Sequence, residues 1–244
     1  MGRAALDLPG KQLELVQSIE KTGVPIIIVL VNGRPISEPW LDENMPAIIE
    51  AWEPGSLGGQ AVSEIIFGDV NPSGKLPLTV ARTVGQLKMF YNHKHSKYFR
   101  DYAMQTNKPL YSFGFGLSYT KFDISKPKLN SSKFKKGILS VSVNVKNIGE
   151  ISGDEVVQLY ISDKYSSITR PVKELKAYQR VSLKPGESKE ILFELNKSAF
   201  AYYDSEMNYI VEAGDFDIRV GNSSRDEDLK NLTFNVEKTL YIKD

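Results

Sequence analysis

The second half of the chain alternates apolar and polar residues with a period of two. After about residue 122, Val, Leu, Ile or Phe occupies every second position in a series of short runs, several of them separated by turn-forming sequences such as Lys-Pro-Gly-Glu at 184–187. Because successive side chains of a strand point to opposite faces, this period predicts strands that bury one face. Strands at this spacing predict an antiparallel β-sandwich over residues 122–244. The runs are residues 141–145, 157–161, 191–195, 216–220 and 232–236.

The beginning of the chain shows helical and strand patterns in turn. Residues 11–22 place apolar side chains about one helical turn apart and are followed by Gly23, which predicts a helix and its stop. Residues 25–31, Pro-Ile-Ile-Ile-Val-Leu-Val, form a continuous apolar run. Such a run is typical of a parallel strand buried on both faces.

Residues 47–80 predict a strand, a glycine-rich loop, a helix and a further strand. The apolar run at 47–52 is the first strand, and the helix carries its apolar residues at 61–66 on one stripe and ends at Gly68. An Asn-Pro-Ser-Gly turn then leads into a predicted strand at 75–80. The order helix, strand, strand, helix, strand indicates α/β structure.

Residues 1–80 contain too few strands and helices to bury the apolar strand at 25–31 on both faces. A strand that is apolar on both faces needs helices on both sides and strands at both edges, yet residues 1–80 supply about two helices and three strands. We therefore predict that this region is a piece of a larger α/β domain. The alternative is a small α/β domain that is complete in itself.

Residues 82–109 have no periodicity and contain both histidines among polar and aromatic side chains. A long loop of this kind is usually functional or a linker, and Tyr91, His93 and Arg100 are our candidates for contact with a sugar. The alternative is a solvated loop. His93 and His95 are two residues apart without a third evident ligand, so we predict no metal site. Residues 109–121, where aromatics alternate with glycines, are predicted to be the linker and interface between two domains.

Composition narrows the possible functions. The 244 residues carry 31 basic and 30 acidic side chains, a net charge of +1, which signals neither a nucleic-acid partner nor a membrane-binding patch. No apolar run approaches the roughly 18 residues of a transmembrane helix, and the first residues lack the apolar core of a signal peptide. Without cysteine there is no thiolate nucleophile and no Cys-Trp-Cys pattern of an immunoglobulin domain, so a fibronectin-III-like sandwich fits better.

A nucleotide cofactor is not predicted. The segment from Gly68 to Lys75 imitates a phosphate-binding loop, but five residues separate its glycines where the motif has four, and Leu76 replaces the expected Ser or Thr. The segment also follows a helix instead of opening one. We expect no cofactor of any kind.

Several motifs together resemble a known family. Pro-Gly-x-x-Gly-Gly-x-Ala-Val and Phe-Gly-Asp-x-Asn-Pro-Ser-Gly-Lys-Leu-Pro, both within residues 51–77, look like the C-terminal part of glycoside hydrolase family 3 β-glucosidases. Further blocks in the same order extend the resemblance over nearly the whole chain. They are residues 3–10, 31–35, 110–120 and 211–214.

The resemblance implies that residues 1–108 are the C-terminal part of the family's α/β sandwich domain and residues 122–244 its fibronectin-III-like domain. It also implies a retaining hydrolase of terminal β-D-glucosyl or related residues, whose substrate would be a β-glucoside or oligosaccharide. In this family the nucleophilic Asp lies on an N-terminal barrel, and the acid/base Glu lies just upstream of the block at 3–10. We therefore expect no catalytic residue in this chain and a missing barrel domain as its partner. We also expect the isolated chain to be inactive. The alternative is a non-catalytic carbohydrate- or protein-binding sandwich. By analogy, a periplasmic or secreted location is plausible. The acids weighed and not assigned are Asp42, Glu43, Glu50, Glu53, Glu64 and Asp69.

Overall fold

The computed structural model describes residues 4–86, 89–96, 100–131, 133–134 and 137–242. The chain divides into two compact units, each assembled from separate segments. Unit 1 consists of Met1–Val70, Thr79–Met89 and Arg100–Tyr111. Unit 2 consists of Asn71–Leu78, Phe90–Phe99 and Ser112–Asp244. The chain therefore passes between the units more than once before the sandwich begins.

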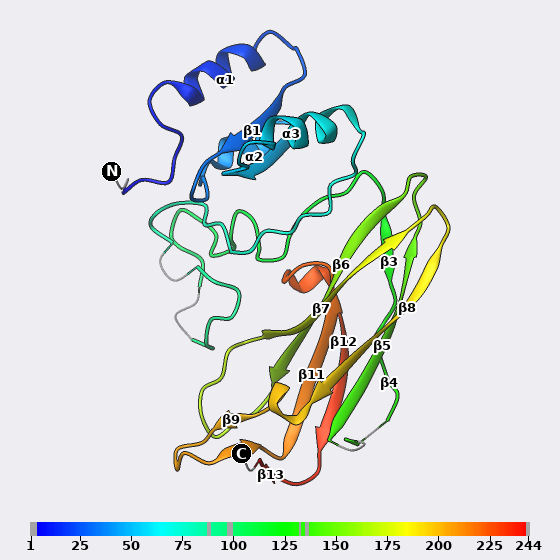
Figure 1. The fold of residues 1–244 in the computed structure, drawn as a ribbon. Coiled ribbons are helices and arrows are strands. Elements are labelled where there is room, and N and C mark those ends of the chain that lie inside the picture. Colours follow the sequence, from blue (N-terminus) through cyan, green and yellow to red (C-terminus); the bar gives the residue numbers. More distant parts are fainter. Residues whose placement is uncertain (1–3, 87–88, 97–99, 132, 135–136, 243–244) are drawn as a thin grey trace. The chain divides into compact units, whose positions relative to one another are not determined.

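Unit 1 is built around two parallel strands (Figure 1). Its strands pair in register from Ile27 opposite Ala47 to Leu30 opposite Glu50. Helix α1 buries no side chain, and α3 ends at Gly68 in the left-handed conformation, with φ of 82°. The elements are α1 (Gln12–Glu20), β1 (Ile27–Val31), α2 (Pro39–Asn44), β2 (Ala47–Trp52) and α3 (Gly58–Phe67).

The predicted helices at 11–22 and 61–66 and the strands at 25–31 and 47–52 are confirmed as α1, α3, β1 and β2. Helix α2 was not predicted, although Pro at its first position is a recognised start signal. The ends of β1 are not buried, since Ile27 is 46% and Val31 66% exposed.

The predicted strand at 75–80 is wrong. Only Val80 makes an isolated bridge, to Tyr111 in the same unit. The backbone N–H of Leu76 donates to the carbonyl of Phe115, and the carbonyl of Leu76 accepts from Gly114, so the segment's hydrogen bonds go to a partner forty residues away. Pro77 in addition has no N–H to give a ladder.

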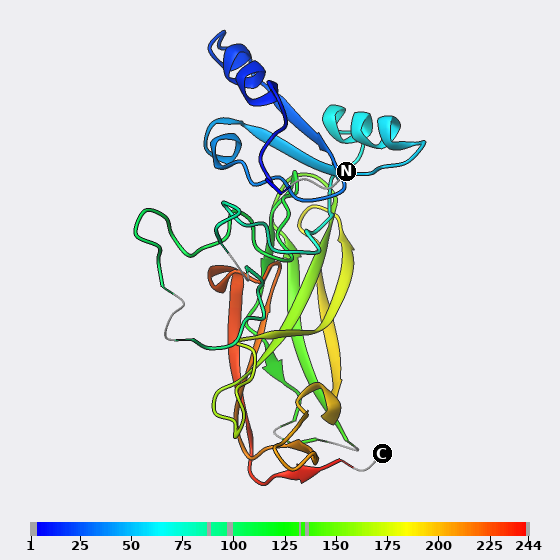
Figure 2. The same cartoon turned by 90° about the vertical axis from the view of Figure 1, so that its left-hand side faces the viewer.

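Unit 2 is an antiparallel β-sandwich, as predicted (Figures 1 and 2). One sheet has the order β12-β11-β6-β7; in the other, β5 pairs with β3 and β4 and with β8. A small sheet of β9, β10 and β13 adjoins them. The strands are β3 (Phe122–Ile124), β4 (Lys128–Leu129), β5 (Ile138–Asn147), β6 (Gly153–Asp163), β7 (Glu174–Leu183), β8 (Ser188–Asn196), β9 (Tyr202–Tyr203), β10 (Tyr209–Val211), β11 (Gly214–Gly221), β12 (Leu229–Val236) and β13 (Leu240–Tyr241), with short 3-10 helices η1 (Lys197–Ala199) and η2 (Asp226–Asp228).

The core of unit 2 lies between the two large sheets. The inward-facing residues of the alternating runs are its members, and they identify the predicted runs as β5, β6, β8, β11 and β12. Phe200 is fully buried and packs edge-on against Phe216, with ring centroids 5.4 Å apart. Strand β7 was not predicted because only its last residues, Val181 and Leu183, alternate as buried positions.

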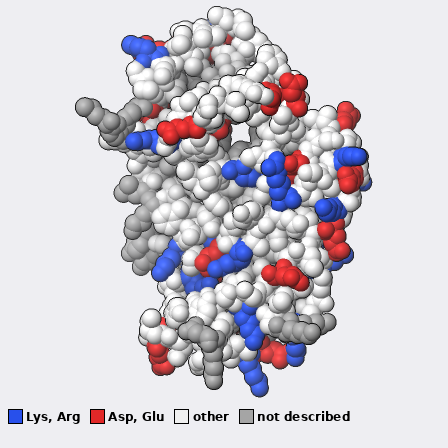
Figure 3. All heavy atoms as spheres, viewed as in Figure 1, with Lys and Arg blue, Asp and Glu red and all other residues white. Residues whose placement is uncertain are grey.

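On the face seen in Figure 3, basic and acidic side chains are scattered among uncharged ones without a large area of one sign. Among the described residues, no helix combines the length and the apolar content that crossing a bilayer would require.

Asp217 of β11 is a buried carboxylate held by polar partners. Thr233 Oγ1 donates to Asp217 Oδ1 over 2.9 Å, and Lys164 Nζ lies 3.2 Å away. Burial alone would raise the pKa of Asp217, but these partners outweigh it and hold the pKa below the usual 3.8. The carboxylate therefore stabilises the folded state above that pH.

We expect unit 2 to become less stable as pH is lowered, because Asp217 becomes protonated. Since the folded-state pKa of Asp217 lies below its unfolded-state value, its contribution is present above the unfolded-state pKa and is lost as pH falls through the folded-state pKa. Asp217→Asn should lower the calorimetric unfolding midpoint at pH 7. The difference in midpoint between the variant and the parent protein should shrink towards pH 3. Asp123→Asn, at a side chain 61% exposed, is the control. A constant difference at all pH values would contradict this role.

Candidate functional site

The motif-bearing segment 71–78 is fixed to the sandwich by a buried ion pair. Lys75 Nζ lies 2.8 Å from Glu155 Oε1, and the two side chains are 11% and 4% exposed. Lys75 also donates to the carbonyl of Gly116 over 3.1 Å. Glu155 accepts from the N–H of Val156 and from Asn222 Nδ2. The two charges are thus partnered on several sides, as burial of an ion pair requires.

Asn71 supports the same segment. Its Oδ1 accepts from the hydroxyl of Ser118 over 2.9 Å and from the N–H of Tyr119 over 2.8 Å. Its Nδ2 donates to the carbonyl of Ser152 over 3.0 Å. Through Asn71, the Asn-Pro-Ser-Gly turn therefore hydrogen-bonds segment 71–78 to segment 112–121 and to the residue just before β6.

The glycines of segment 112–121 are required for close approach. A Cβ on Gly114 would collide with the side chain of Gln158, and one on Gly116 with the carbonyl of Gly74. Gln158 Nε2 in turn donates to the carbonyl of Gly114 over 3.0 Å. The alternation of glycine and aromatic residues here serves packing against β6.

Tyr91, a predicted sugar contact, is part of this packing. Its ring stacks on Phe113 with centroids 4.3 Å apart and an interplanar angle of 18°, and it meets Tyr160 edge-on at 5.8 Å. Its hydroxyl accepts from the N–H of Leu175 over 3.3 Å. One face of the ring is therefore covered by the protein itself.

His93 lies beside Tyr91 in the same unit, and Arg100 belongs to the other. The carbonyl of His93 accepts from the N–H of Val172 over 2.9 Å, and Lys94 forms a bridge with Pro171. Segment 90–96 thus runs along the chain just before β7. Arg100 is exposed in unit 1. The structure brings together two of the three predicted residues, and their role in binding sugar stays a prediction.

Sequence reasoning missed Lys173 and Arg225: Arg225 contacts segment 112–121 directly, and Lys173 binds Ser224, which hydrogen-bonds to that segment. Lys173 Nζ donates to the carbonyl of Ser224 over 2.7 Å, and Arg225 lies over the ring of Phe115 at 4.6 Å. The N–H of Ser224 donates to the carbonyl of Phe113. Each partner lies far away in sequence, so no local spacing could reveal these contacts.

Near the carboxyl ends of β1 and β2, unit 1 carries an unusual backbone conformation and a carboxyl group with a shifted pKa. Trp52 has a φ of 53°, unusual for a residue with a side chain. Asn32 Nδ2 donates to Glu50 Oε1 over 3.0 Å. Burial raises the pKa of Glu50, while hydrogen bonds from Trp52 and Asn32 oppose the rise. Burial, with a further contribution from Asp7, also raises the pKa of Glu38.

These acids do not assemble a recognisable catalytic centre. Glu50 is engaged by its own neighbours on the sheet, which is the environment of a structural carboxylate. Among the residues that the structure describes, no group of three His, Asp or Glu side chains could hold a metal ion. Acid/base catalysis by a glycosidase needs two carboxyl groups placed on either side of the scissile bond.

Comparison with protein families gives two matches. The family model described as "Glycosyl hydrolase family 3 C-terminal domain" matches residues 1–119. The model described as "Fibronectin type III-like domain" matches residues 155–224. Together they span most of the chain.

Curated relatives and solved structures agree with these matches. A β-xylosidase of Formosa agariphila is 45% identical over 96% of this chain and 33% of its own length. A periplasmic β-glucosidase of Salmonella typhimurium is 39% identical over 91% of this chain and 30% of its own length. A solved β-glucosidase from Erythrobacter marinus superposes with a TM-score of 0.90 at 43% identity, over 96% of this chain and 31% of that one. The chain thus spans about a third of the relatives it matches.

Breaking the Lys75–Glu155 pair should strongly destabilise unit 2. Lys75→Met leaves Glu155 buried and without its cation, at an expected loss of about 3–5 kcal/mol in the free energy of unfolding by urea titration. Adding Glu155→Gln should recover part of the loss, because the amide keeps an acceptor without the charge. Lys133→Met, in a pair whose side chains are 73% and 71% exposed, is the control and should cost under ~1 kcal/mol. Equal effects of Lys75→Met and Lys133→Met would show that the buried pair is not needed.

Proposed function

Because the chain belongs to glycoside hydrolase family 3, matching its C-terminal domain and a fibronectin type III-like domain, we propose that it is the C-terminal part of a retaining β-glucosidase-type enzyme. By family it is a glycoside hydrolase. Relatives over more than nine-tenths of its length are named β-xylosidase or β-glucosidase, which supports hydrolysis of a terminal β-D-glucosyl or related residue.

One observation carries this proposal. The matches to the two relatives include more than nine-tenths of this chain but only about a third of each relative's length. Two thirds of such an enzyme would lie outside these residues. We propose that the nucleophilic Asp and the acid/base Glu are there, on and beside an N-terminal barrel domain that is the partner of this chain. The residues present would then have a supporting role and no turnover of their own.

Unit 1 supports the same view. We propose that it is the end of an α/β sandwich domain, because among the described residues β1 pairs on one edge only, and the apolar ends of the strand are exposed. Leu15 of α1 and Phe67 of α3 are 60% and 80% exposed. Parallel sheets bury both faces, so further strands and helices from an upstream segment would cover these side chains.

The substrate would be a β-glucoside or oligosaccharide. A solved β-glucosidase from Listeria innocua, 37% identical over 96% of this chain, has been crystallised with laminaribiose. Of the three predicted sugar contacts, Arg100 is the best candidate for direct contact, since the ring of Tyr91 is stacked on Phe113. A periplasmic or secreted location stays a prediction by analogy.

The proposal predicts inactivity in isolation and activity on complementation. The 244-residue chain should not hydrolyse an aryl β-glucoside, whereas co-expression with the upstream coding sequence should give turnover. Replacing the proposed upstream nucleophile by Ala in that partner should abolish it. Turnover by the chain alone would contradict the proposal. A natural gene that encodes no barrel, together with binding to insoluble glucan, would instead favour a non-catalytic carbohydrate- or protein-binding sandwich.

Arg100 can be tested in the complete enzyme. We expect Arg100→Ala to raise KM for the aryl β-glucoside by about tenfold, roughly 1.4 kcal/mol of binding, with a smaller change in kcat. Lys108→Ala removes another exposed cation of the same loop and is the control. Unchanged KM in Arg100→Ala, or an equal change in both variants, would remove Arg100 from the site.

A further inference from the structure

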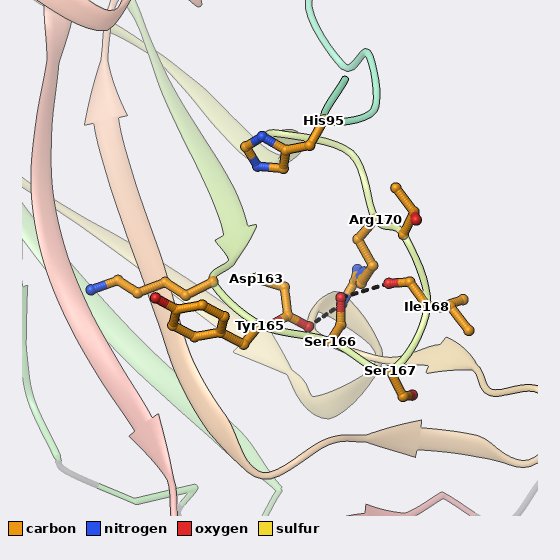
Figure 4. A pocket seen from close by; sticks show the side chains of 9 residues that line it. His95, Asp163, Tyr165, Ser166, Ser167, Ile168 and Arg170 are labelled. Carbon is orange, nitrogen blue, oxygen red and sulfur yellow. Dashed lines mark hydrogen bonds and ion pairs between the residues drawn. The ribbon is translucent and has the colours of Figure 1, made fainter. Parts of the chain in front are cut away.

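A polar pocket of about 270 Å³ opens beside the connection between β6 and β7 in unit 2. Residues 163–170 line it, and His95 of segment 90–96 lies across from Asp163 and Arg170 (Figure 4). Neither family motifs nor the proposed catalysis uses this pocket. Its size is slightly below the range of pockets for drug-sized ligands, about 300–1,000 Å³, so it suits a smaller ligand.

The floor of the pocket is a rigid ionic cluster. The side chains of Arg170 and Asp163 are 7% and 2% exposed and approach to 3.3 Å. Arg170 also pairs with Glu174 over 2.9 Å, donates to the carbonyl of Phe200 and lies over the ring of Tyr202 at 4.8 Å. A guanidinium held by so many partners does not need an anionic ligand.

The remaining ammonium group among the lining residues is also paired. Lys164 Nζ lies 3.2 Å from Asp217. The pocket therefore offers little free charge of either sign. This balance favours a neutral ligand over a phosphate, a carboxylate or a cation.

The wall of the pocket is held in place before any ligand arrives. Ser166 Oγ donates to the carbonyl of Ile168 over 2.7 Å, and the N–H of Ser167 donates to Glu212 Oε2 over 2.9 Å. Ser167 Oγ lies 3.0 Å from the hydroxyl of Tyr202. A wall already fixed in this way loses little conformational freedom when a ligand binds.

Hydroxyl and imidazole groups remain for a ligand. Within the part of the chain that the structure describes, His95 and the hydroxyl of Thr169 make no hydrogen bond or ion pair. The hydroxyls of Ser166 and Ser167 keep unused hydrogen-bonding capacity, because each can donate once and accept twice. Groups that both donate and accept match a ring of sugar hydroxyls, which do the same.

We propose that this pocket binds one pyranose unit of a neutral sugar. Its volume suits a single ring, its charges are internally balanced, and its free groups are hydroxyls and an imidazole. The proposal does not rest on the glycosidase function, because the pocket lies entirely within unit 2 and needs no upstream residue. Its failure would leave the proposed function untouched.

The test is titration of the ¹⁵N-labelled 244-residue chain with methyl β-D-glucopyranoside and methyl β-D-xylopyranoside by NMR. We expect saturable shifts of the amides of residues 163–170 for at least one sugar. His95→Ala and Thr169→Val should each weaken binding at least fivefold. Asn92→Ala removes a neighbouring exposed polar side chain that does not line the pocket and should leave the affinity within twofold.

Several results would overturn the proposal. They are the absence of saturable shifts with either glycoside, shifts confined to residues outside 163–170, and equal loss of affinity in Asn92→Ala and His95→Ala. Tighter binding of inorganic phosphate or of linear sorbitol than of either glycoside would also overturn it, because the pocket would then recognise charge or polyols in general.

Discussion

Two opposite charges buried together, those of Lys75 and Glu155, join a segment from early in the chain to the second long strand of the sandwich. Neither charge could stay at that depth alone, since an unpaired buried charge costs several kcal/mol. Segment 71–78 is therefore part of the folded sandwich. Segments 90–96 and 112–121 are bound to the sandwich by uncharged contacts, the stacking of Tyr91 on Phe113 and the hydrogen bonds of Asn71 and Gln158.

This arrangement gives the family motifs a physical meaning. Asn-Pro-Ser-Gly-Lys-Leu-Pro and the glycine-aromatic run after residue 110 resemble functional loops in sequence, yet their polar atoms and glycines are used to attach one segment to another. Lys75 is a structural cation, and Gly114 and Gly116 are small because Gln158 and Gly74 lie against them.

The sequence predicted those features whose cause is local. The alternating runs became β5, β6, β8, β11 and β12, and the apolar stripe at 61–66 became α3, because side-chain period alone determines which face is buried. The strand at 75–80 failed because its hydrogen bonds depend on Gly114 and Phe115. The stacking of Tyr91 and the pairing of Lys173 with Asp226 likewise depend on tertiary contacts, which no spacing encodes.

Native-state hydrogen exchange on the 244-residue chain tests most directly whether these segments and the sandwich fold together. The amides of Leu76, Gly114 and Val172, which donate to carbonyls of segments 71–78, 90–96 and 112–121, should open in the same cooperative step as the ladder between β6 and β11. Amides of β1 should exchange earlier and independently. Exchange of Leu76 and Gly114 while the β6–β11 ladder stays protected would contradict the account.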